Sequence, residues 1–155
     1  HVRSRRQRQM CIRDSIIVDL PWPENKLFAK KCKKNSINFI QLLSPTTSKD
    51  RIKKIIKDSH DMIYYISMLS TTGGKLKISS RQILKNYKKI KKYAPSKNLV
   101  IGFGITKETI ASLKKADGLV VGSQLCKTIA YSLKKRLNVV KILNKMVYNL
   151  KKEIT

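Results

Sequence analysis

The sequence predicts an α/β fold built from repeated βα units, and two features carry this prediction. Short apolar runs alternate along the chain with Lys-rich stretches whose apolar residues recur at helical spacing. The apolar runs are nearly continuous and rich in β-branched or aromatic residues, as strands are when both faces of a parallel sheet are covered. From residue 16 onward, the chain therefore predicts a parallel sheet with helices packed on it.

Strands and helices are expected in alternation, five of each. The strands are predicted over residues 16–18, 37–43, 62–66, 99–101 and 119–121. The helices are predicted over residues 24–34, 48–57, 80–92, 107–114 and 133–151, with a further helical stretch opening after Gly122. Ser79 with Gln82 fits a capping box at the third helix, and Thr47 with Asp50 fits one less well at the second.

The positions of the glycines separate two ways of arranging such units. A doubly wound sheet usually has a glycine-rich turn after its first strand, whereas Asp19, Leu20 and Pro21 follow the first strand here. The glycines come late, and (βα)8 barrels bind phosphate in the loops after their last strands. Five units are too few to close a barrel, so the sequence predicts the later part of a (βα)8 TIM barrel.

Composition limits the class of protein. The 155 residues suffice for one domain, and no apolar run nears the roughly 18 residues of a membrane span, so no membrane partner is expected. The cysteines Cys11, Cys32 and Cys126 are widely spaced and odd in number. That spacing favours reduced thiols in a cytoplasmic protein over a disulfide framework or a metal site.

The net charge of +26 has two explanations. Lys, Ile and Asn, whose codons are rich in A and T, make up 54 of the 155 residues, so genome composition accounts for much of the basicity. The alternative is a basic nucleic-acid-binding module, which usually interleaves Arg with aromatic residues. Because Lys recurs here at helical spacings, solvated helix faces are favoured and no nucleic-acid partner is expected.

The first 15 residues differ in composition from the rest. They hold five of the eight Arg and no Lys, whereas residues 16–155 hold all 27 Lys and three Arg. The segment has no apolar core of a secretory signal. We expect residues 1–15 to be a non-native arm, and residues 16–155 to be the C-terminal part of one barrel domain.

Glycines after three predicted strands indicate a phosphate site. The segments are 70–74, 102–105 and the pair Gly122-Ser123, which opens a helix. Glycine lets backbone N–H groups approach an anion, and a helix N-terminus adds free donors and a favourable dipole. Since all three segments would lie at the carboxyl edge of the sheet, we expect a phosphomonoester to bind there.

Residues for covalent or acid–base chemistry are scarce. No Ser-His-Asp or Cys-His arrangement has useful spacing, and His60 is expected at the surface. Cys126, on the helix after Gly122, is expected in the core. Asp19 is the one acid at the carboxyl end of a predicted strand, and it fits a buried polar anchor better than an active-site acid.

Several segments in one order and spacing resemble a known family. They are VDLP at 18–21, LLSPTT at 42–47, YYIS at 64–67, TG at 72–73, GFGI at 102–105 and ADGLVVGS at 116–123. Together they are similar to the tryptophan synthase alpha-chain family over roughly residues 16–152. Two alternatives stay open: another phosphate-binding (βα)8 enzyme, such as an indole-glycerol-phosphate synthase or a ribulose-phosphate epimerase, and the basic nucleic-acid-binding module.

The resemblance implies a (βα)8 barrel of which this chain supplies strands four to eight. It implies a lyase of tryptophan biosynthesis that cleaves indole-3-glycerol phosphate by a retro-aldol reaction to indole and glyceraldehyde 3-phosphate. By the same resemblance, the substrate phosphate binds the backbone of Gly73, Gly104, Gly122 and Ser123, and the substrate pocket includes Tyr64, Thr72 and Phe103. Thr72 would lie on a loop that closes over the substrate.

The resemblance also implies a partner protein, and it implies that this chain lacks the catalytic residues. The partner is the tryptophan synthase beta chain in an α2β2 assembly in the cytoplasm, where the cofactor PLP belongs to the beta chain and none to this chain. The Asp19-Leu20-Pro21 turn matches a region near that contact. The family's catalytic Glu and Asp precede the fourth strand, so no catalytic residue is expected here. Alone, with open sheet edges, the chain is expected to be inactive and marginal, oligomeric or partly molten.

Overall fold

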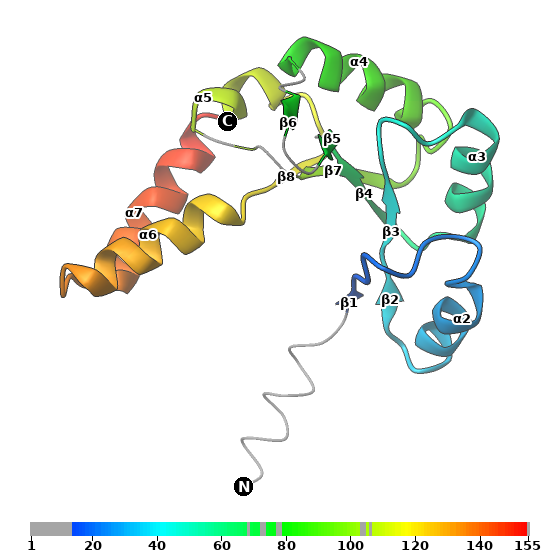
Figure 1. The fold of residues 1–155 in the computed structure, drawn as a ribbon, viewed down its shortest axis with the longest axis horizontal. Helices are drawn as coiled ribbons and strands as arrows, with labels where there is room; N and C mark the ends of the chain where they lie inside the picture. Colours follow the sequence, from blue (N-terminus) through cyan, green and yellow to red (C-terminus); the bar gives the residue numbers. More distant parts are fainter. Residues whose placement is uncertain are drawn as a thin grey trace, which may run out of the picture.

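The structure is a computed structural model that describes residues 14–67, 69–71, 74–76, 79–102, 105 and 107–154. Within these residues it confirms an α/β fold with a parallel sheet (Figure 1). The central sheet has four parallel strands in the order β3 (Gln41–Leu43), β4 (Met62–Ile66), β7 (Asn98–Gly102) and β8 (Gly118–Val120). Two short strands, β1 (Asp14–Ser15) and β2 (Asn38–Phe39), pair in parallel beside it.

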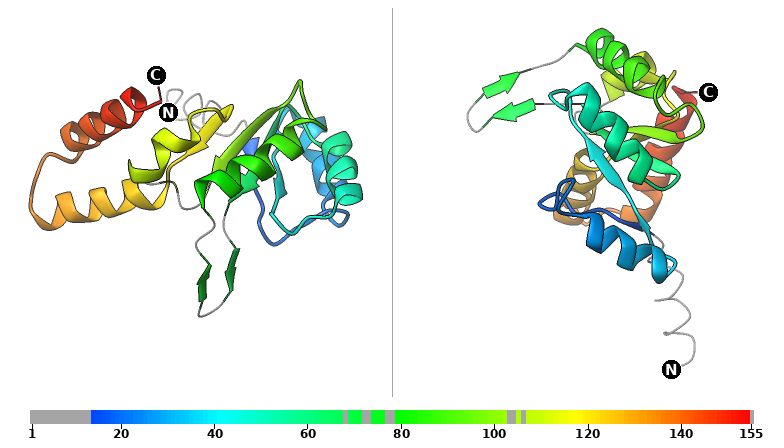
Figure 2. Two further views of the ribbon diagram at one scale, coloured as in Figure 1. Left: turned by 90° about the horizontal axis from the view of Figure 1, so that it is seen from above. Right: turned by 90° about the vertical axis from the view of Figure 1, so that its right-hand side faces the viewer.

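Helices follow the strands as expected for βα units. They are α2 (Lys26–Lys34), α3 (Lys49–Asp58), α4 (Ser80–Lys91), α5 (Lys107–Ile110) with the 3-10 turn η1 (Ala111–Leu113), α6 (Ser123–Lys134) and α7 (Val139–Lys152). An antiparallel hairpin, β5 (Leu69–Thr71) and β6 (Gly74–Leu76), stands away from the sheet (Figure 2). The sequence does not predict this hairpin.

The main hydrophobic core lies between one face of the sheet and α3, α4 and η1. Alternation along β4 buries Ile63 and Tyr65 completely and leaves the residues between them half-buried. Helix α3 contributes an apolar stripe at helical spacing, which includes Ile52 and Ile55. Nearly continuous apolar runs predicted strands covered on both faces, but the structure buries only one face fully within the described residues.

The first predicted strand, over residues 16–18, is wrong. In its place Asp14 and Ser15, which the sequence predicts to lie in the arm, pair with β2, and the Ile40 N–H donates to the Ser15 carbonyl at 2.9 Å. The chain then turns at Val18, whose side chain is 65% exposed. A β-branched run favours an extended backbone, but no neighbouring strand among the described residues continues beside it.

The other strands are confirmed, with shifts of one or two residues at most. The strand predicted over residues 37–43 forms as two pieces, β2 and β3, separated at the buried Ile40. The next prediction, residues 62–66, matches β4 at both ends. The last two strands form as β7 and β8.

Two helix predictions need correction. The last helix does not begin at Leu133, because α6 continues to Lys134 and the chain reverses at Arg136 (φ 53°) before Asn138 caps α7. The capping box at Thr47 is also wrong. Ser48 is the residue that precedes α3, and the Thr47 hydroxyl instead accepts from the Ser44 N–H at 3.0 Å. The capping bond from the Gln82 N–H to Ser79 Oγ is confirmed at 3.3 Å.

Candidate functional site

The carboxyl edge of the sheet brings together the segments that predict a phosphate site. Register places Leu42, Tyr64, Val100 and Gly118 in one row across the four strands, and Ile66, Gly102 and Val120 in a second row nearer the carboxyl edge. Because side chains alternate between faces, both rows project from the face opposite the helices. That face is therefore the one that carries the candidate site.

Tyr64 and Gly102 are in direct contact across β4 and β7. A Cβ atom added to Gly102 would lie 1.8 Å from Tyr64 Oη and 2.1 Å from Tyr64 Cζ, so the ring occupies the space above this glycine. Burial raises the pKa of the Tyr64 hydroxyl. Ser67, at the end of β4, donates its hydroxyl to the Gly102 carbonyl at 2.8 Å and fixes the two strand ends together.

Gly122 and Ser123 lie where β8 passes into α6, as the sequence predicts. The Gly122 carbonyl accepts from the Cys126 N–H at 3.1 Å, the first bond of the helix, and no side chain caps this end. A Cβ atom at Gly122 would meet no other described atom within 4 Å. The first-turn N–H groups of α6 can therefore be approached from outside the chain.

Other predicted site residues have varied outcomes. Gly73, Thr72, Phe103 and Gly104 lie outside the described residues, so their roles stay predictions. His60 is exposed, as predicted, and its Nδ1 lies 3.3 Å from Asp61 Oδ2.

Two of the predictions for single residues are wrong. Asp19 is exposed in a turn and is not a buried anchor, because the chain leaves the sheet before it. Cys126 is exposed and is not part of the core, because its side of α6 faces away from α7 and the sheet.

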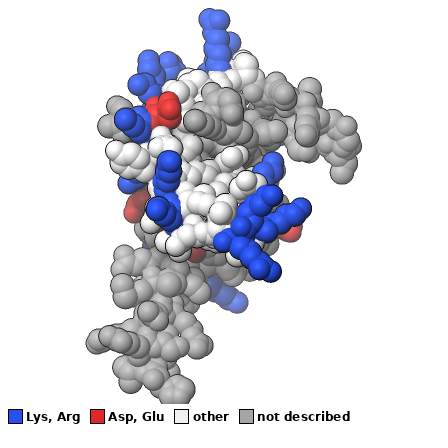
Figure 3. All heavy atoms as spheres, turned by 90° about the vertical axis from the view of Figure 1, so that its left-hand side faces the viewer, with Lys and Arg blue, Asp and Glu red and all other residues white. Residues whose placement is uncertain are grey.

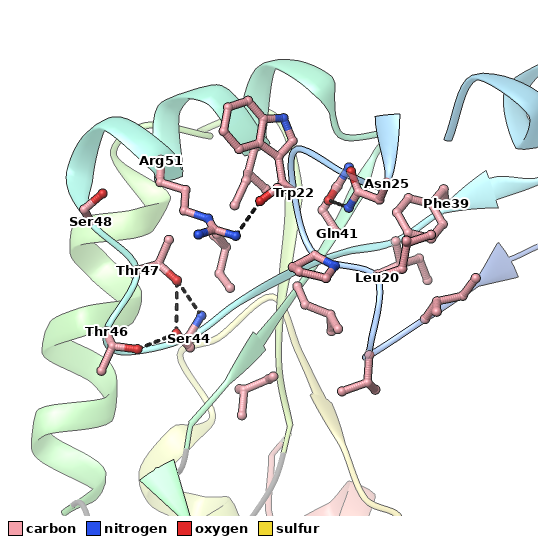
Figure 4. A pocket seen from close by; sticks show the side chains of 18 residues that line it. Leu20, Trp22, Asn25, Phe39, Gln41, Ser44, Thr46, Thr47, Ser48 and Arg51 are labelled. Carbon is pink, nitrogen blue, oxygen red and sulfur yellow. Dashed lines mark hydrogen bonds between the residues drawn. The ribbon is translucent and has the colours of Figure 1, made fainter. Parts of the chain in front are cut away.

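A cavity of about 400 Å³ lies beside β3 at the same edge of the sheet (Figure 4). Its walls are partly apolar and partly polar, and they come from the loop over residues 17–22, from β3 and the segment after it, and from α3. They include Leu20, Leu42 and Ile66. Gly122 and Ser123 do not line it, since they lie at the junction of β8 and α6, at the other end of the four-stranded sheet.

A buried amide pair borders this cavity, and the sequence analysis missed it. Asn25 Nδ2 donates to Gln41 Oε1 at 2.8 Å, and both side chains are 2% exposed. Asn25 Oδ1 has no hydrogen-bond partner among the described atoms. The pair joins the start of α2 to β3, across 16 residues of sequence, so no local pattern could have indicated it.

Trp22 holds the same loop against α3. Its indole Nε1 donates to Asp58 Oδ2 at 2.7 Å, and Arg51 donates to the Trp22 carbonyl. The Lys26 ammonium lies 4.9 Å from the centre of the indole ring. Together with the amide pair, these contacts fix the wall of the cavity.

The opposite, amino edge of the sheet carries a charged cluster with a structural role. Asp117 accepts from Lys91 Nζ at 2.6 Å and from the Leu99 N–H at 2.8 Å, which connects β8, α4 and β7. Partial burial raises the Asp117 pKa. The bond from Leu99 and then those from Lys91 and Tyr87 outweigh this effect, so that the pKa is lowered.

No group of three His, Cys, Asp or Glu that could hold a metal ion occurs among the residues that the structure describes. In the same residues, no helix is both long and apolar enough to cross a membrane.

Fold and site together define a class: part of a parallel (βα)8 barrel with glycine-bearing loops at the carboxyl edge of its strands. Comparison with solved structures agrees. The alpha subunit of tryptophan synthase from Legionella pneumophila superposes with a TM-score of 0.78 at 26% identity, over 91% of this chain and 51% of that chain. A tryptophan synthase complex from Pyrococcus furiosus shares the fold, with a TM-score of 0.68 at 24% identity.

Sequence comparison is more specific. The tryptophan synthase alpha chain of Pelagibacter ubique is 69% identical over 140 residues, which are 90% of this chain and 53% of that protein. The alpha chain of Pyropia yezoensis is 37% identical over 122 residues. The family description "Tryptophan synthase alpha chain" matches residues 4–155. The chain belongs to the tryptophan synthase alpha-chain family and spans about half the length of the curated relatives it matches.

Proposed function

We propose that this chain carries the phosphate-binding half of an enzyme that cleaves indole-3-glycerol phosphate to indole and glyceraldehyde 3-phosphate. The observation that carries the proposal is the junction of β8 and α6, where Gly122 and Ser123 present an uncapped helix N-terminus at the carboxyl edge of the sheet. Family membership favours this substrate over those of other phosphate-binding barrels.

The phosphate is proposed to bind the first-turn N–H groups of α6. These donors have no partner within the helix, and the helix dipole favours an anion there. Since no described protein atom approaches the Gly122 Cβ position, packing within the described chain does not require glycine here. Close approach of a ligand to the backbone would require it. Gly73 and Gly104 are proposed to add further backbone donors.

The rest of the substrate is proposed to extend across the edge of the sheet from β8 toward β3. Strands β3 and β8 are separated by three strand-to-strand spacings, which is about 14 Å at roughly 4.8 Å per spacing. Tyr64 lies between them, and the cavity beside β3 offers apolar side chains such as Leu20, Leu42 and Ile66 to the flat indole. Thr72 and Phe103 are proposed to complete the pocket.

The chemical step requires groups that the described residues do not bring to this edge. A proton must reach the indole carbon while a base takes a hydroxyl proton from the glycerol chain. We propose that the two carboxyl groups for these steps belong to the part of the barrel that precedes strand four. The whole enzyme is proposed to be a cytoplasmic lyase that works with a tryptophan synthase beta chain, to which the cofactor PLP belongs.

Phosphate binding can be tested by amide NMR with indole-3-glycerol phosphate. We expect the Gly122 and Ser123 signals to shift, and Ser123→Asp to abolish the shifts because the new carboxylate repels the phosphate. Ser80→Asp is the matched control, since Ser80 is likewise the first residue of a helix, α4. Equal loss in both variants, or no shift at all, would contradict the proposed site.

The reaction can be tested with a joined enzyme. The part of the Pelagibacter ubique alpha chain that this chain does not match, fused before residue 16, is expected to give a protein that releases indole. This chain alone is expected to release none. Indole release by this chain alone would show that the catalytic groups lie within it.

A further inference from the structure

The amide pair of Asn25 and Gln41 lies in the interior of the described structure, where apolar side chains would be expected. Each side chain is 2% exposed, and Asn25 Nδ2 donates to Gln41 Oε1 at 2.8 Å. Asn25 Oδ1 has no partner among the described atoms, so the pair is only partly satisfied. A buried amide with an unmet hydrogen bond is less favourable than an apolar side chain of the same shape. The pair therefore contributes a defined geometry more than it contributes stability.

The pair connects two walls of the cavity beside β3 (Figure 4). Gln41 lies on β3, whereas Asn25 directly precedes α2 and comes three residues after the loop over residues 17–22. The Asn25 N–H donates to the Pro21 carbonyl at 3.0 Å, which ties the end of this loop to Asn25. Leu20, which lines the cavity, is the residue before Pro21. The amide pair thus sets the distance between the loop and β3.

The same loop is also attached to α3, by contacts that are more exposed. Trp22 Nε1 donates to Asp58 Oδ2 at 2.7 Å, and Arg51 donates to the Trp22 carbonyl, both at exposed positions. Exposed polar contacts compete with water and hold a side chain less firmly than buried ones. Since Asn25 and Gln41 are almost excluded from water, their bond is the firmer attachment of the loop.

The position of this wall matters to a flat apolar ligand, which gains affinity only from atoms at contact distance. A gap of about 0.5–1 Å already removes roughly a quarter to a half of the dispersion attraction. A wall that stands in place before binding also avoids the entropic cost of ordering it. Leu20 of the loop and Leu42 of β3 both line this cavity of about 400 Å³. The separation of the loop from β3 therefore determines how well a ring fits.

We propose that Asn25 and Gln41 are positioning residues for the indole end of the substrate. Their hydrogen bond holds the loop over residues 17–22 at the distance from β3 that an indole ring fills, and neither residue touches a reacting atom. The inference rests on the proposed function, because that function assigns the cavity to indole. The phosphate site at Gly122 and Ser123 lies at the other end of the four-stranded sheet and does not depend on the pair.

Binding of 5-fluoroindole to the full chain, measured by fluorine NMR, tests the inference apart from phosphate binding and catalysis. Lys and Arg total 35 against nine acids, and they border the face drawn in Figure 3, so an anionic probe would be attracted to many places. The probe is therefore uncharged. Gln41→Met keeps the length of the side chain and removes the acceptor, and we expect 5-fluoroindole to bind this variant about tenfold more weakly. The amide shifts of Gly122 and Ser123 with inorganic phosphate should not change.

Gln82→Met is the matched control. Gln82 Nε2 donates to Asn86 Oδ1 at 3.2 Å, in an exposed amide pair on α4. This variant should leave the affinity for 5-fluoroindole unchanged. Equal weakening by Gln41→Met and Gln82→Met would overturn the inference, and so would equal affinity of Gln41→Met and the parent.

A double variant separates positioning from stability. Asn25→Leu combined with Gln41→Met replaces both amides by apolar side chains of similar shape, so the free energy of unfolding should return close to that of the parent. The loop still lacks its directional bond, so 5-fluoroindole should still bind weakly. The Lys26 N–H, which donates to the Pro23 carbonyl at 3.1 Å, should also exchange with solvent faster than in the parent. Recovery of affinity together with stability would show that the pair only stabilises the fold, and would overturn the inference.

The joined enzyme gives a kinetic readout of the same role. Gln41→Met should raise the KM for indole-3-glycerol phosphate about tenfold and leave kcat nearly unchanged, because it weakens binding of the ground state and the transition state equally. A fall in kcat at unchanged KM would place the effect of the pair on the chemical step, and would overturn the positioning role.

The inference and the proposed function fail in different ways. If neither the full chain nor the joined enzyme binds 5-fluoroindole, the assignment of the cavity to indole is wrong, and the inference fails with it. If the parent binds 5-fluoroindole and Gln41→Met binds it equally well, the inference alone fails and the proposed function stands.

Discussion

At the scale of single residues, Gly102 and Tyr64 form the most restrictive contact of the candidate site. Gly102→Ala would place a methyl group where Tyr64 Cζ and Oη lie, so the ring must leave its position above β7. We expect a loss of about 1–3 kcal/mol in the free energy of unfolding, the usual effect of overpacking. Urea denaturation measures it, with loss of ligand-induced amide shifts as a second readout.

A double variant checks the cause. In Tyr64→Leu the side chain is shorter and leaves room for the added methyl, so Gly102→Ala should cost less in that background than in the parent. Gly122→Ala is a control for the loss of a glycine, since a Cβ there meets no described atom. If Gly102→Ala costs the same in the parent and in the Tyr64→Leu background, the contact with the ring is not the cause.

Asp117 makes a prediction about pH. Its pKa in the folded state lies below the ordinary value of 3.8, so the carboxylate stabilises the fold above that value, and this contribution is lost as pH falls through the lower, folded-state pKa. Asp117→Asn should lower the free energy of unfolding at neutral pH by about 1–3 kcal/mol, because the contact with Lys91 loses its charge. The free energy of unfolding of this variant should also fall less steeply as the solution is made acidic. Urea denaturation at several pH values, from neutral to about 3, measures this.

Asp61→Asn is the control for that prediction. Asp61 is 88% exposed, so its replacement should change stability by less than about 0.5 kcal/mol at neutral pH. If the free energy of unfolding falls as steeply in acid for Asp117→Asn as for the parent, other carboxyl groups are responsible for the pH dependence of stability.

At the scale of helices and strands, the caps provide a test with an internal comparison. Ser79 Oγ accepts from the Gln82 N–H, and Asn138 Oδ1 accepts from the Lys141 N–H at 3.0 Å. Ser48 precedes α3 in an extended conformation but makes no such bond. Alanine at 79 or 138 should cost about 1 kcal/mol of stability, and alanine at 48 only a few tenths. Thermal unfolding of the three variants ranks them, and equal losses would contradict the assignment of caps.

Elements with strong local signals could be predicted from the sequence. The β4 boundaries and the Ser79 cap follow from an apolar run and from capping chemistry, both of which are local. The strand predicted over residues 16–18 failed because strand formation also needs a neighbour, and β2 pairs instead with Asp14 and Ser15. The α6–α7 boundary failed because apolar residues continue through the turn at Arg136.

The residues of the candidate site likewise fall into those that local sequence could place and those whose position depends on packing. Gly122 and Ser123 could be placed at a strand–helix junction because their neighbours in sequence define it. The contact of Tyr64 with Gly102 depends on the register of β4 against β7, which packing decides. The exposure of Cys126 could not be predicted, since it depends on which side of α6 is covered.

At the scale of the whole molecule, net charge should limit stability. Lys and Arg total 35 against nine acids, so a compact state concentrates like charges. Added sodium chloride should therefore raise the melting temperature, by roughly 3 °C for each kcal/mol of repulsion that is screened. Differential scanning calorimetry measures the change. A variant with Lys30, Lys33 and Lys134 changed to Gln should respond less, and an equal response would attribute the effect to something other than repulsion.

The chain on its own should melt broadly. One face of the sheet has a packed core, whereas the row that includes Tyr64 on the other face is only half-buried. Eight large apolar side chains between residues 120 and 154 are exposed. Cooperative melting needs elements that lose their contacts together, but α6 and α7 pack mainly on each other and can separate first. Repulsion opposes rescue by self-association, so we expect a monomer whose helical signal is lost over a wide temperature range. A sharp, single transition in a monomer, by circular dichroism and calorimetry alike, would contradict this.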